Sequence, residues 1–305
     1  MNEKILTFFH KVKAWFSNGK LKKIFRMTAD VSWNVLLIFI ILGVIGGFFL
    51  GGIGLGYFAS LVKDETIRPK EVMAQNIYNY EETTEIYFAD NIYLGKLSAD
   101  LHREEVSIKD VSPYVIDAVI ATEDEYFHEH KGVVPKAIFR ALFQEFTNSA
   151  TKSGGSTLTQ QLIKNQILTN EVSFERKAKE ILLALRLEQF FEKDEILEAY
   201  LNVVPFGRDS SGRNIAGIQT AAQGVFGLNA DELNLPQAAF LAGLPQSPFG
   251  YTPFKNGGEL KSEEGLEPGL KRMKIVLDRM LETGKINQDD YEYAINYDIV
   301  ADFID

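Results

Sequence analysis

Residues 121–132 read Ala121-Thr-Glu-Asp-Glu-Tyr-Phe-His-Glu-His-Lys-Gly132 and follow an apolar run over 115–120. We expect one helix over 113–130. Ser112 before it is a favoured N-cap residue, and Pro113 is favoured at the first helical position. This stretch joins a helix of the core to a cluster of charged residues, and the rest of the chain is organised around it.

Three residues of this stretch would share one face of such a helix. Glu123, Phe127 and His130 are spaced i, i+4 and i+7. A carboxylate at the end of an apolar helix is partly desolvated, which suits it to proton transfer. A lone glutamate at a helix end is more often simply solvated, so the catalytic interpretation depends on other parts of the chain.

Composition excludes several classes of protein. The 305 residues could form one large or two modest domains with a substantial core. Four His and no Cys rule out a disulfide framework, a zinc–thiolate site and a cysteine nucleophile. The net charge is −10, although residues 1–30 carry seven Lys and Arg against two acidic residues. The remainder is therefore strongly acidic, and we expect no nucleic-acid partner.

Residues 31–62 carry no charge and predict a transmembrane helix. As a helix they would span roughly 48 Å, against a hydrocarbon core of about 30 Å. Trp33 and Tyr57 lie near the two ends, where interfacial aromatic residues are expected. The basic leader over 1–30 predicts a cytoplasmic N-terminus, with the chain after Lys63 outside the cytoplasmic membrane. A cleaved signal peptide is the alternative, but the apolar run is too long for a typical one.

Gly43, Gly47 and Gly51 repeat every four residues in this segment. Such a ridge can pack against another transmembrane helix, which would allow self-association. Glycine is also common in membrane spans generally, so both interpretations stay open.

The rest of the chain is predicted to be mainly helical. A connector over 63–111 contains a short β-hairpin over 84–95, whose turn residues are Asp90 and Asn91. A core over 112–255 and a C-terminal part over 256–305 follow, with a solvated loop over 256–268 and a last helix capped by Asn287. Helices are expected over 113–130, 134–147, 157–168, 174–192, 194–203, 215–226, 235–243 and 269–283. Strands are too few for a Rossmann-type sheet.

The stretch Ser153-Gly-Gly-Ser-Thr-Leu-Thr-Gln-Gln-Leu-Ile-Lys-Asn165 can bind an anion. Ser156 can cap the following helix, on which Thr157, Gln161 and Lys164 lie at i, i+4 and i+7. A helix N-terminus with a cation on the same face is a plausible phosphate site. An ordinary capped amphipathic helix explains the pattern equally well.

Two further stretches are less specific by themselves. Arg176 and Glu180 are one helical turn apart, and an intrahelical ion pair explains them. The functional interpretation makes Glu180 a second carboxylate facing Glu123, as glycosyl-transfer chemistry uses. The stretch over 193–202 is an amphipathic helix that contains Glu198 and ends at Asn202.

In this order, the four stretches resemble the motifs of family-51 peptidoglycan glycosyltransferases, the glycan-polymerising module of class A penicillin-binding proteins. The matches are Glu-Asp-x-x-Phe-x-x-His-x-Gly (Glu123 to Gly132), Gly-Gly-Ser-Thr-x-Thr-Gln-Gln (Gly154 to Gln161), Arg-Lys-x-x-Glu (Arg176 to Glu180) and Glu-x-Tyr-Leu-Asn (Glu198 to Asn202). The resemblance covers about 84–297 and includes similar segments at 217–227 and 238–246. The second motif is highly specific.

The resemblance implies a mainly α, lysozyme-like glycosyltransferase domain with a small membrane-proximal jaw lobe at about 131–153, after a single transmembrane helix and the hairpin. It implies that lipid II is polymerised into β-1,4 glycan with inversion. Glu123 would be the general base, and Glu180 would position groups or stabilise charge. Lys164, Arg140 and Arg176, with Ser156 and Thr157, would hold the pyrophosphate.

Other matched residues would support or contact the substrate: Asp124, Phe127, His130, Gln160, Gln161, Glu198 and Asn202. Family members often respond to Mg²⁺ or Mn²⁺, which we expect at the donor pyrophosphate, with no organic cofactor. Expected partners are lipid II, the growing glycan strand, membrane lipid and proteins of cell-wall synthesis or division.

The chain departs from the family pattern in places. Val134 stands where Asp is usual, and Val225-Phe-Gly-Leu228 stands where Tyr-Phe-Gly-Lys is common. A bifunctional class A protein would continue into a transpeptidase after about residue 300, so a truncated protein and an enzyme with one activity are both open. The alternatives to polymerisation are a lysozyme-like hydrolase or lytic transglycosylase, and an inactive membrane-anchored scaffold.

Overall fold

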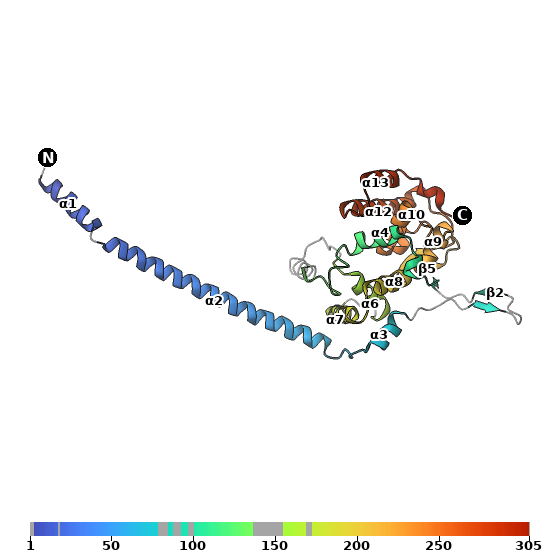
Figure 1. The fold of residues 1–305 in the computed structure, drawn as a ribbon, viewed down its shortest axis with the longest axis horizontal. Coiled ribbons are helices and arrows are strands. Elements are labelled where there is room, and N and C mark those ends of the chain that lie inside the picture. The colour runs from blue at the N-terminus through green and yellow to red at the C-terminus, as the bar shows by residue number, and fades with distance from the viewer. Residues whose placement is uncertain are drawn as a thin grey trace. The chain divides into compact units, whose positions relative to one another are not determined.

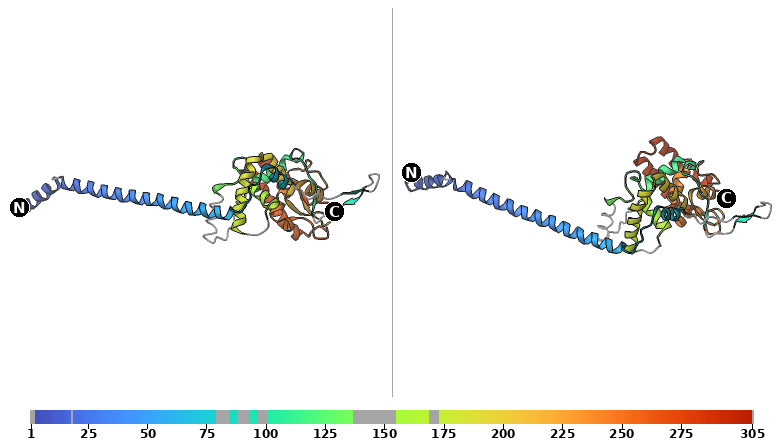
Figure 2. Two further views of the ribbon diagram at one scale, coloured as in Figure 1. Left: turned by 90° about the horizontal axis from the view of Figure 1, so that it is seen from below. Right: turned by 60° about the horizontal axis from the view of Figure 1, so that its bottom comes forward.

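The computed structural model describes residues 3–17, 19–78, 85–87, 93–96, 101–136, 155–168 and 173–304. The chain forms two compact units, Met1–Lys63 and Asp64–Asp305. Both are predominantly helical where described (Figures 1 and 2).

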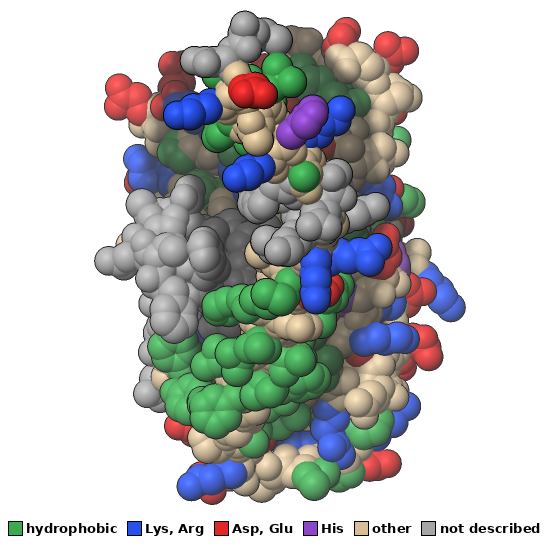
Figure 3. Space-filling model, turned by 90° about the vertical axis from the view of Figure 1, so that its left-hand side faces the viewer, with side chains coloured by type: hydrophobic (Ala, Val, Ile, Leu, Met, Phe, Trp, Pro, Cys, Tyr) green, Lys and Arg blue, Asp and Glu red, His purple; other side chains and the backbone are tan. Residues whose placement is uncertain are grey.

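The first unit consists of two helices, α1 (Glu3–Ser17) and α2 (Lys20–Val62). Gly19 separates them with a left-handed backbone at φ 64°, which glycine adopts without strain. Phe25–Val62 has a mean hydropathy of 2.7 and is long and apolar enough to cross a membrane. Its exposed apolar side chains form a broad green band in Figure 3. The predicted apolar helix is therefore confirmed, and it begins before residue 31.

The glycine ridge lies on α2. A Cβ atom built at Gly43, Gly47 or Gly51 meets nothing within 4 Å. This face is therefore open in the described structure, and self-association through it stays a prediction.

Most helices of the second unit form two groups (Figure 1). In the first group α4 (Pro113–Glu123), α10 (Leu235–Gly243) and α12 (Glu263–Glu282) pack on one another, and α13 (Gln288–Ile295) joins them. In the second group α6 (Leu158–Gln166) packs on α7 (Phe174–Phe190) and α8 (Lys193–Val203), with α3 (Lys70–Ile77) alongside. The remaining helical elements are η1 (Ile108–Asp110), α9 (Ile218–Phe226), η2 (Leu244–Gln246), α11 (Pro248–Tyr251) and η3 (Ile299–Asp302). One continuous apolar core runs through both groups.

Two small sheets complete the second unit. The predicted hairpin is confirmed as the antiparallel pair β1 (Glu85–Tyr87) and β2 (Tyr93–Lys96), while its turn residues lie outside the described residues. A three-stranded sheet has the order β3-β5-β4, with β5 (Asn214–Ala216) parallel to β3 (His102–Arg103) and antiparallel to β4 (Pro205–Arg208). It was not predicted, because strands of two to four residues are too short to show a period of two. The helix expected over 215–226 accordingly begins only at Ile218.

The helix predicted over 113–130 is wrong beyond Glu123. The backbone of Asp124 leaves the helix at φ −159° and ψ 75°. The side chain of Asp124 accepts hydrogen bonds from Leu158 N and His130 Nε2. These contacts hold residues 125–129 in turns, so a long-range interaction overrides the local helical pattern.

The loop predicted over 256–268 is wrong in its second half, because α12 begins at Glu263. Leu266 and Gly269 are buried and anchor this turn, and the helix continues through Pro268. A Cβ at Gly269 would lie 2.6 Å from Tyr251 O, so this close approach needs glycine. At the other end, the predicted stop at Gly284 and the cap at Asn287, which accepts from Asp290 N at 2.9 Å, are confirmed.

Most of the predicted jaw lies outside the described residues. Of the range 131–153 the structure describes 131–136, and of the predicted helix over 134–147 it describes 134–136. Arg140 and Gly154 also fall outside, so their predicted roles stay predictions.

Two polar residues of α8 hold the segment that leads into α4. The side chain of Asn202 is buried, accepts from Val106 N at 2.9 Å and donates to Val106 O at 2.9 Å. Glu198 Oε2 accepts from Ile108 N at 2.8 Å, at the start of η1. Glu198 and Asn202 therefore have partners inside the fold, and any effect of theirs on a site would be indirect.

We predict that Asn202→Ala lowers the free energy of unfolding by roughly 1–3 kcal/mol, because both backbone groups of Val106 lose their partner. Urea denaturation followed by circular dichroism measures this. Asn296→Ala is the matched control: its amide donates to Glu292 O at an exposed site, and we expect a change within about 0.5 kcal/mol. Equal effects of the two substitutions would contradict the assigned role of Asn202.

Candidate active site

The carboxylate of Glu123 lies at the C-terminal end of α4 and is held from two sides. Gln161 Nε2 on α6 donates to Glu123 Oε2 at 3.0 Å. Arg272 Nη2 on α12 donates to Glu123 Oε1 at 3.1 Å. The side chain of Glu123 is 17% exposed and that of Arg272 is 11% exposed. The two helix groups thus meet at one partly buried, paired carboxylate that still reaches the surface.

Asp124 ties the end of α4 to the start of α6. Its Oδ2 accepts from Leu158 N, the first residue of α6, at 3.0 Å, and from His130 Nε2 at 2.8 Å. His130 Nδ1 accepts from Gly132 N at 3.1 Å, which leaves Nε2 as the nitrogen that donates to Asp124. An acidic group at a helix N-terminus is favourable, so Asp124 orients α6 and with it Gln161.

A buried network continues from His130. Glu188 Oε1 accepts from Thr159 Oγ1 at 2.6 Å and lies 3.5 Å from His130 Nδ1, and Glu188 Oε2 accepts from Lys193 Nζ at 2.6 Å. Lys193 Nζ also lies 4.5 Å from the centre of the Phe127 ring, which is fully buried. Phe127 and His130 therefore have contacts inside the protein, and these contacts hold the loop that follows Glu123.

The sequence had predicted Ser156 as the N-cap of α6. In the structure the N-cap is the next residue, Thr157. Thr157 Oγ1 accepts from Gln160 N at 3.1 Å, and Gln160 Oε1 accepts from Thr157 N at 3.1 Å, which forms a capping box. The hydroxyl of Thr157 also donates to Gly132 O at 2.7 Å. Ser156 Oγ instead accepts from Lys177 Nζ at 2.7 Å.

Glu180 is buried on α7 and has three donors. Oε1 accepts from Gln160 Nε2 at 3.2 Å and from Lys177 Nζ, and Oε2 accepts from Arg176 Nη1 at 3.1 Å. The intrahelical ion pair expected from the sequence is present. Since its side chain is only 2% exposed, Glu180 acts here by holding Arg176 and Lys177 beside the start of α6.

Lys164 is exposed in the last turn of α6. It follows Gln161 at i+3, so the two side chains are neighbours on one helix face, with Cβ atoms about 5–6 Å apart. Gln161 binds Glu123, so Lys164 lies on the helix that contacts this carboxylate, one turn beyond the contacting residue. The adjacent residues Gln160 and Gln161 thus bind one carboxylate each, Glu180 and Glu123.

Tyr200 on α8 is fully buried, and its hydroxyl has no partner among the described residues. Burial, and next the charge of Glu123, raise the pKa of Tyr200 well above its ordinary value, while Arg272 opposes this. The phenol is therefore neutral at physiological pH and lies within the electrostatic reach of Glu123.

Sequence reasoning missed Arg272, Lys177 and Tyr200 as site residues. Arg272 lies on a helix recognised only by its apolar stripe, and its partner is 149 positions away in the sequence. Nothing local marks such a pair. Tyr200 and Lys177 stand inside the quoted motifs, so motif membership was the available signal for both.

No cluster of three or more His, Asp or Glu suited to a metal ion occurs among the described residues. Both oxygens of Glu180 already accept from cations. The described residues therefore do not fit a metal held by the protein alone.

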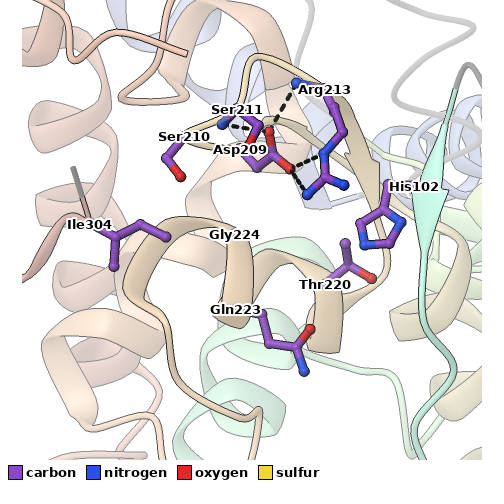
Figure 4. Close-up of a pocket in the computed structure, with 9 residues that line it drawn as sticks. All are labelled: His102, Asp209, Ser210, Ser211, Arg213, Thr220, Gln223, Gly224 and Ile304. Atoms are coloured by element: carbon purple, nitrogen blue, oxygen red, sulfur yellow. Dashed lines mark hydrogen bonds and ion pairs between the residues drawn. The ribbon is translucent and has the colours of Figure 1, made fainter. Parts of the chain in front are cut away.

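A separate small cavity of about 120 Å³ lies at the turn between β4 and β5 and beside α9 (Figure 4). Arg213 folds back on Asp209 there, with Nε 2.8 Å from Oδ2. None of the predicted site residues lines this cavity. Asp209 also accepts from Ser211 N and Arg213 N, so its carboxylate shapes the turn.

Comparisons with known proteins agree with the sequence motifs. A family model described as Transglycosylase matches residues 90–281. Penicillin-binding protein 1A of Aquifex aeolicus is 40% identical over 215 residues, which covers 70% of this chain and 28% of that protein. Penicillin-binding protein 1A of Haemophilus influenzae is 36% identical over 275 residues, which covers 90% of this chain and 28% of that protein. A crystal structure of the Haemophilus influenzae protein covers 71% of this chain and 21% of that chain, with 24% identity and a TM-score of 0.39.

This chain thus spans less than a third of the length of these curated relatives. The match to the family model, from residue 90 to residue 281, includes all four motif stretches.

We predict that Asp124→Ala lowers the free energy of unfolding by roughly 2–4 kcal/mol, because Leu158 N and His130 lose a charged acceptor. Asp117→Ala on the same helix is the control. Its partner Lys285 and Asp117 itself are each 34% exposed, and such a surface pair contributes about 1 kcal/mol at most. Denaturant titrations of both variants measure the difference, and a loss for Asp124→Ala no larger than that of the control would contradict the tie between α4 and α6.

Proposed function

The chain belongs to the transglycosylase family, and from this premise we propose that it is a peptidoglycan glycosyltransferase that polymerises lipid II into β-1,4-linked glycan strands. The observation that carries the proposal is the hydrogen bond from Gln161 on α6 to Glu123, because the exposed Lys164 follows Gln161 by one turn of the same helix. Base and cation are what transfer from a pyrophosphate-linked sugar requires.

Glu123 is proposed as the general base. Its carboxylate accepts the proton of the acceptor sugar's 4-hydroxyl while that oxygen attacks C1 of the donor sugar. The C1–O4 bond forms as the bond from C1 to the pyrophosphate oxygen breaks, and attack from the opposite face inverts the anomeric carbon. The contacts with Arg272 and Gln161 fix the orientation of the carboxylate.

The leaving pyrophosphate develops negative charge that cations must stabilise. Lys164 is proposed to meet this charge directly, together with Arg176, whose Nε is buried and has no partner among the described residues. Arg140 stays a predicted third cation. Glu180 is then a positioning residue: it holds Arg176 and Lys177, and Lys177 in turn holds Ser156.

The proposal includes a location. The apolar helix would anchor the chain in the cytoplasmic membrane, with the basic N-terminus inside and Asp64–Asp305 outside. The lipid tail of the substrate lies in the same bilayer, so an anchored enzyme searches a restricted space for it.

Mg²⁺ or Mn²⁺ is proposed only as a companion of the donor pyrophosphate, since hard cations bind phosphate oxygens and water readily. No step of the reaction is assigned to it. Proteins of cell-wall synthesis or division, and a second copy bound through α2, stay proposed partners.

We predict that Glu123→Gln lowers lipid II polymerisation by about 10²–10⁴-fold, because the amide cannot accept the proton. Gel analysis of glycan from labelled lipid II measures this. Glu125→Gln is the control. Glu125 lies two positions after Glu123 in the sequence and pairs with Arg279 at the surface, so this variant should retain near wild-type activity. Polymerisation unchanged in Glu123→Gln would remove the base assignment. If the wild-type chain shortens preformed glycan and makes no polymer, the hydrolase alternative is correct.

We predict that Lys164→Ala lowers kcat/KM for lipid II by roughly 10-fold to 10³-fold, because the leaving pyrophosphate loses a cation. Steady-state polymerisation rates measure this, with and without Mg²⁺. The control is Lys271→Ala, which removes an exposed lysine of α12 next to Arg272 in the sequence. Equal rates for both variants would exclude Lys164 from the pyrophosphate site.

A further inference from the structure

Helix α1 has an apolar face that the chain's proposed reaction does not use. Ile5, Phe8, Phe9 and Val12 follow the spacing i, i+3, i+4 and i+7, so they form one stripe. Ile5 is 50% exposed, Phe8 63% and Phe9 65%. The opposite face carries Thr7, at a different angle of the same helix. Large apolar side chains gathered on one face of an exposed helix indicate a docking surface.

Basic residues border this stripe. Lys4 and Lys11, spaced i and i+7, lie along one edge, and Lys13 lies along the other. All three are exposed. An apolar stripe between two cationic edges matches the interface of a lipid bilayer, where apolar acyl chains lie beneath anionic headgroups.

The chain itself holds α1 near such a surface. Only residues 18–24 separate α1 from Phe25, where the candidate membrane span begins. Even fully extended, seven residues reach only about 25 Å, and as a helix about 10 Å. The headgroup layer on each side of a bilayer is roughly 5–8 Å thick. The left-handed Gly19 allows α1 to turn away from the direction of α2.

We propose that α1 lies in the headgroup layer of the membrane in which α2 is anchored, with its apolar stripe toward the acyl chains and its lysines on anionic phospholipid. In the proposed topology this is the cytoplasmic leaflet. The inference rests on the membrane anchoring within the proposed function and not on the chemistry of Glu123. The helix would act as a second anchor that binds anionic lipid selectively.

The absence of Cys permits a direct test on the full chain. Phe9→Cys places a nitroxide label on the stripe, and Thr7→Cys places the same label on the opposite face as the matched control. Both proteins are reconstituted in phosphatidylcholine vesicles with and without phosphatidylglycerol. Electron paramagnetic resonance then measures collisions with oxygen, which concentrates in the bilayer, and with a water-soluble nickel chelate.

In vesicles with phosphatidylglycerol we expect the label at position 9 to collide several-fold more often with oxygen than with the chelate, relative to position 7. Replacing Lys4, Lys11 and Lys13 by Ala, or omitting phosphatidylglycerol, should reduce this contrast. High chelate access at both positions would overturn the proposal, because α1 would then lie in water. Protection of position 9 from both reagents would also overturn it, in favour of a protein contact. A contrast that is unchanged without phosphatidylglycerol would overturn the role of anionic lipid.

The same samples separate this inference from the proposed enzyme. A chain that shows the expected contrast but makes no glycan from lipid II would refute the activity and leave the α1 assignment intact. A chain that polymerises lipid II with α1 in water would do the reverse.

Discussion

The packing of the two helix groups in the second unit depends on the contacts of one partly buried carboxylate, that of Glu123. A charge withdrawn from water is tolerated only when it is paired and hydrogen-bonded. Gln161 of α6 and Arg272 of α12 supply these contacts at 3.0 Å and 3.1 Å. Because α6 and α12 belong to different helix groups, the position of Glu123 reports on the packing of both. Removal of either partner would leave an incompletely satisfied charge at the end of α4.

Helix α6 transmits this constraint to the rest of the site. Asp124 fixes its first residue, and the capping box of Thr157 and Gln160 closes its N-terminus. The adjacent side chains Gln160 and Gln161 of α6 then bind Glu180 and Glu123, so a shift of this helix would move both contacts together. The cations differ in their surroundings. Arg176 and Lys177 form ion pairs with Glu180, whereas the side chain of Lys164 is exposed. An exposed cation on the helix that binds the proposed base fits a site that receives an anionic leaving group.

Local patterns predicted most helices of the second unit because their apolar stripes and caps are encoded within a few residues. The hairpin, the stop at Gly284 and the cap at Asn287 follow from the same short-range chemistry. The failures have long-range causes. Asp124 ends α4 through a contact with Leu158, and α12 begins early because Leu266 and Gly269 pack into the core. Arg272 could not be found at all, since a single sequence does not reveal which charges meet across 149 positions. For Arg140 and the jaw the sequence prediction stands alone.

In the proposed reaction, Glu123 and the cations beside α6 face one bound donor. The most direct measurement is an experimental structure of the full chain in detergent with a non-reactive lipid-linked pyrophosphate sugar and a glycan acceptor. We expect the pyrophosphate to contact Lys164, and the acceptor's 4-hydroxyl to lie about 2.6–3.2 Å from a carboxylate oxygen of Glu123. A donor bound away from α6, or an acceptor hydroxyl beyond the reach of Glu123, would contradict the account.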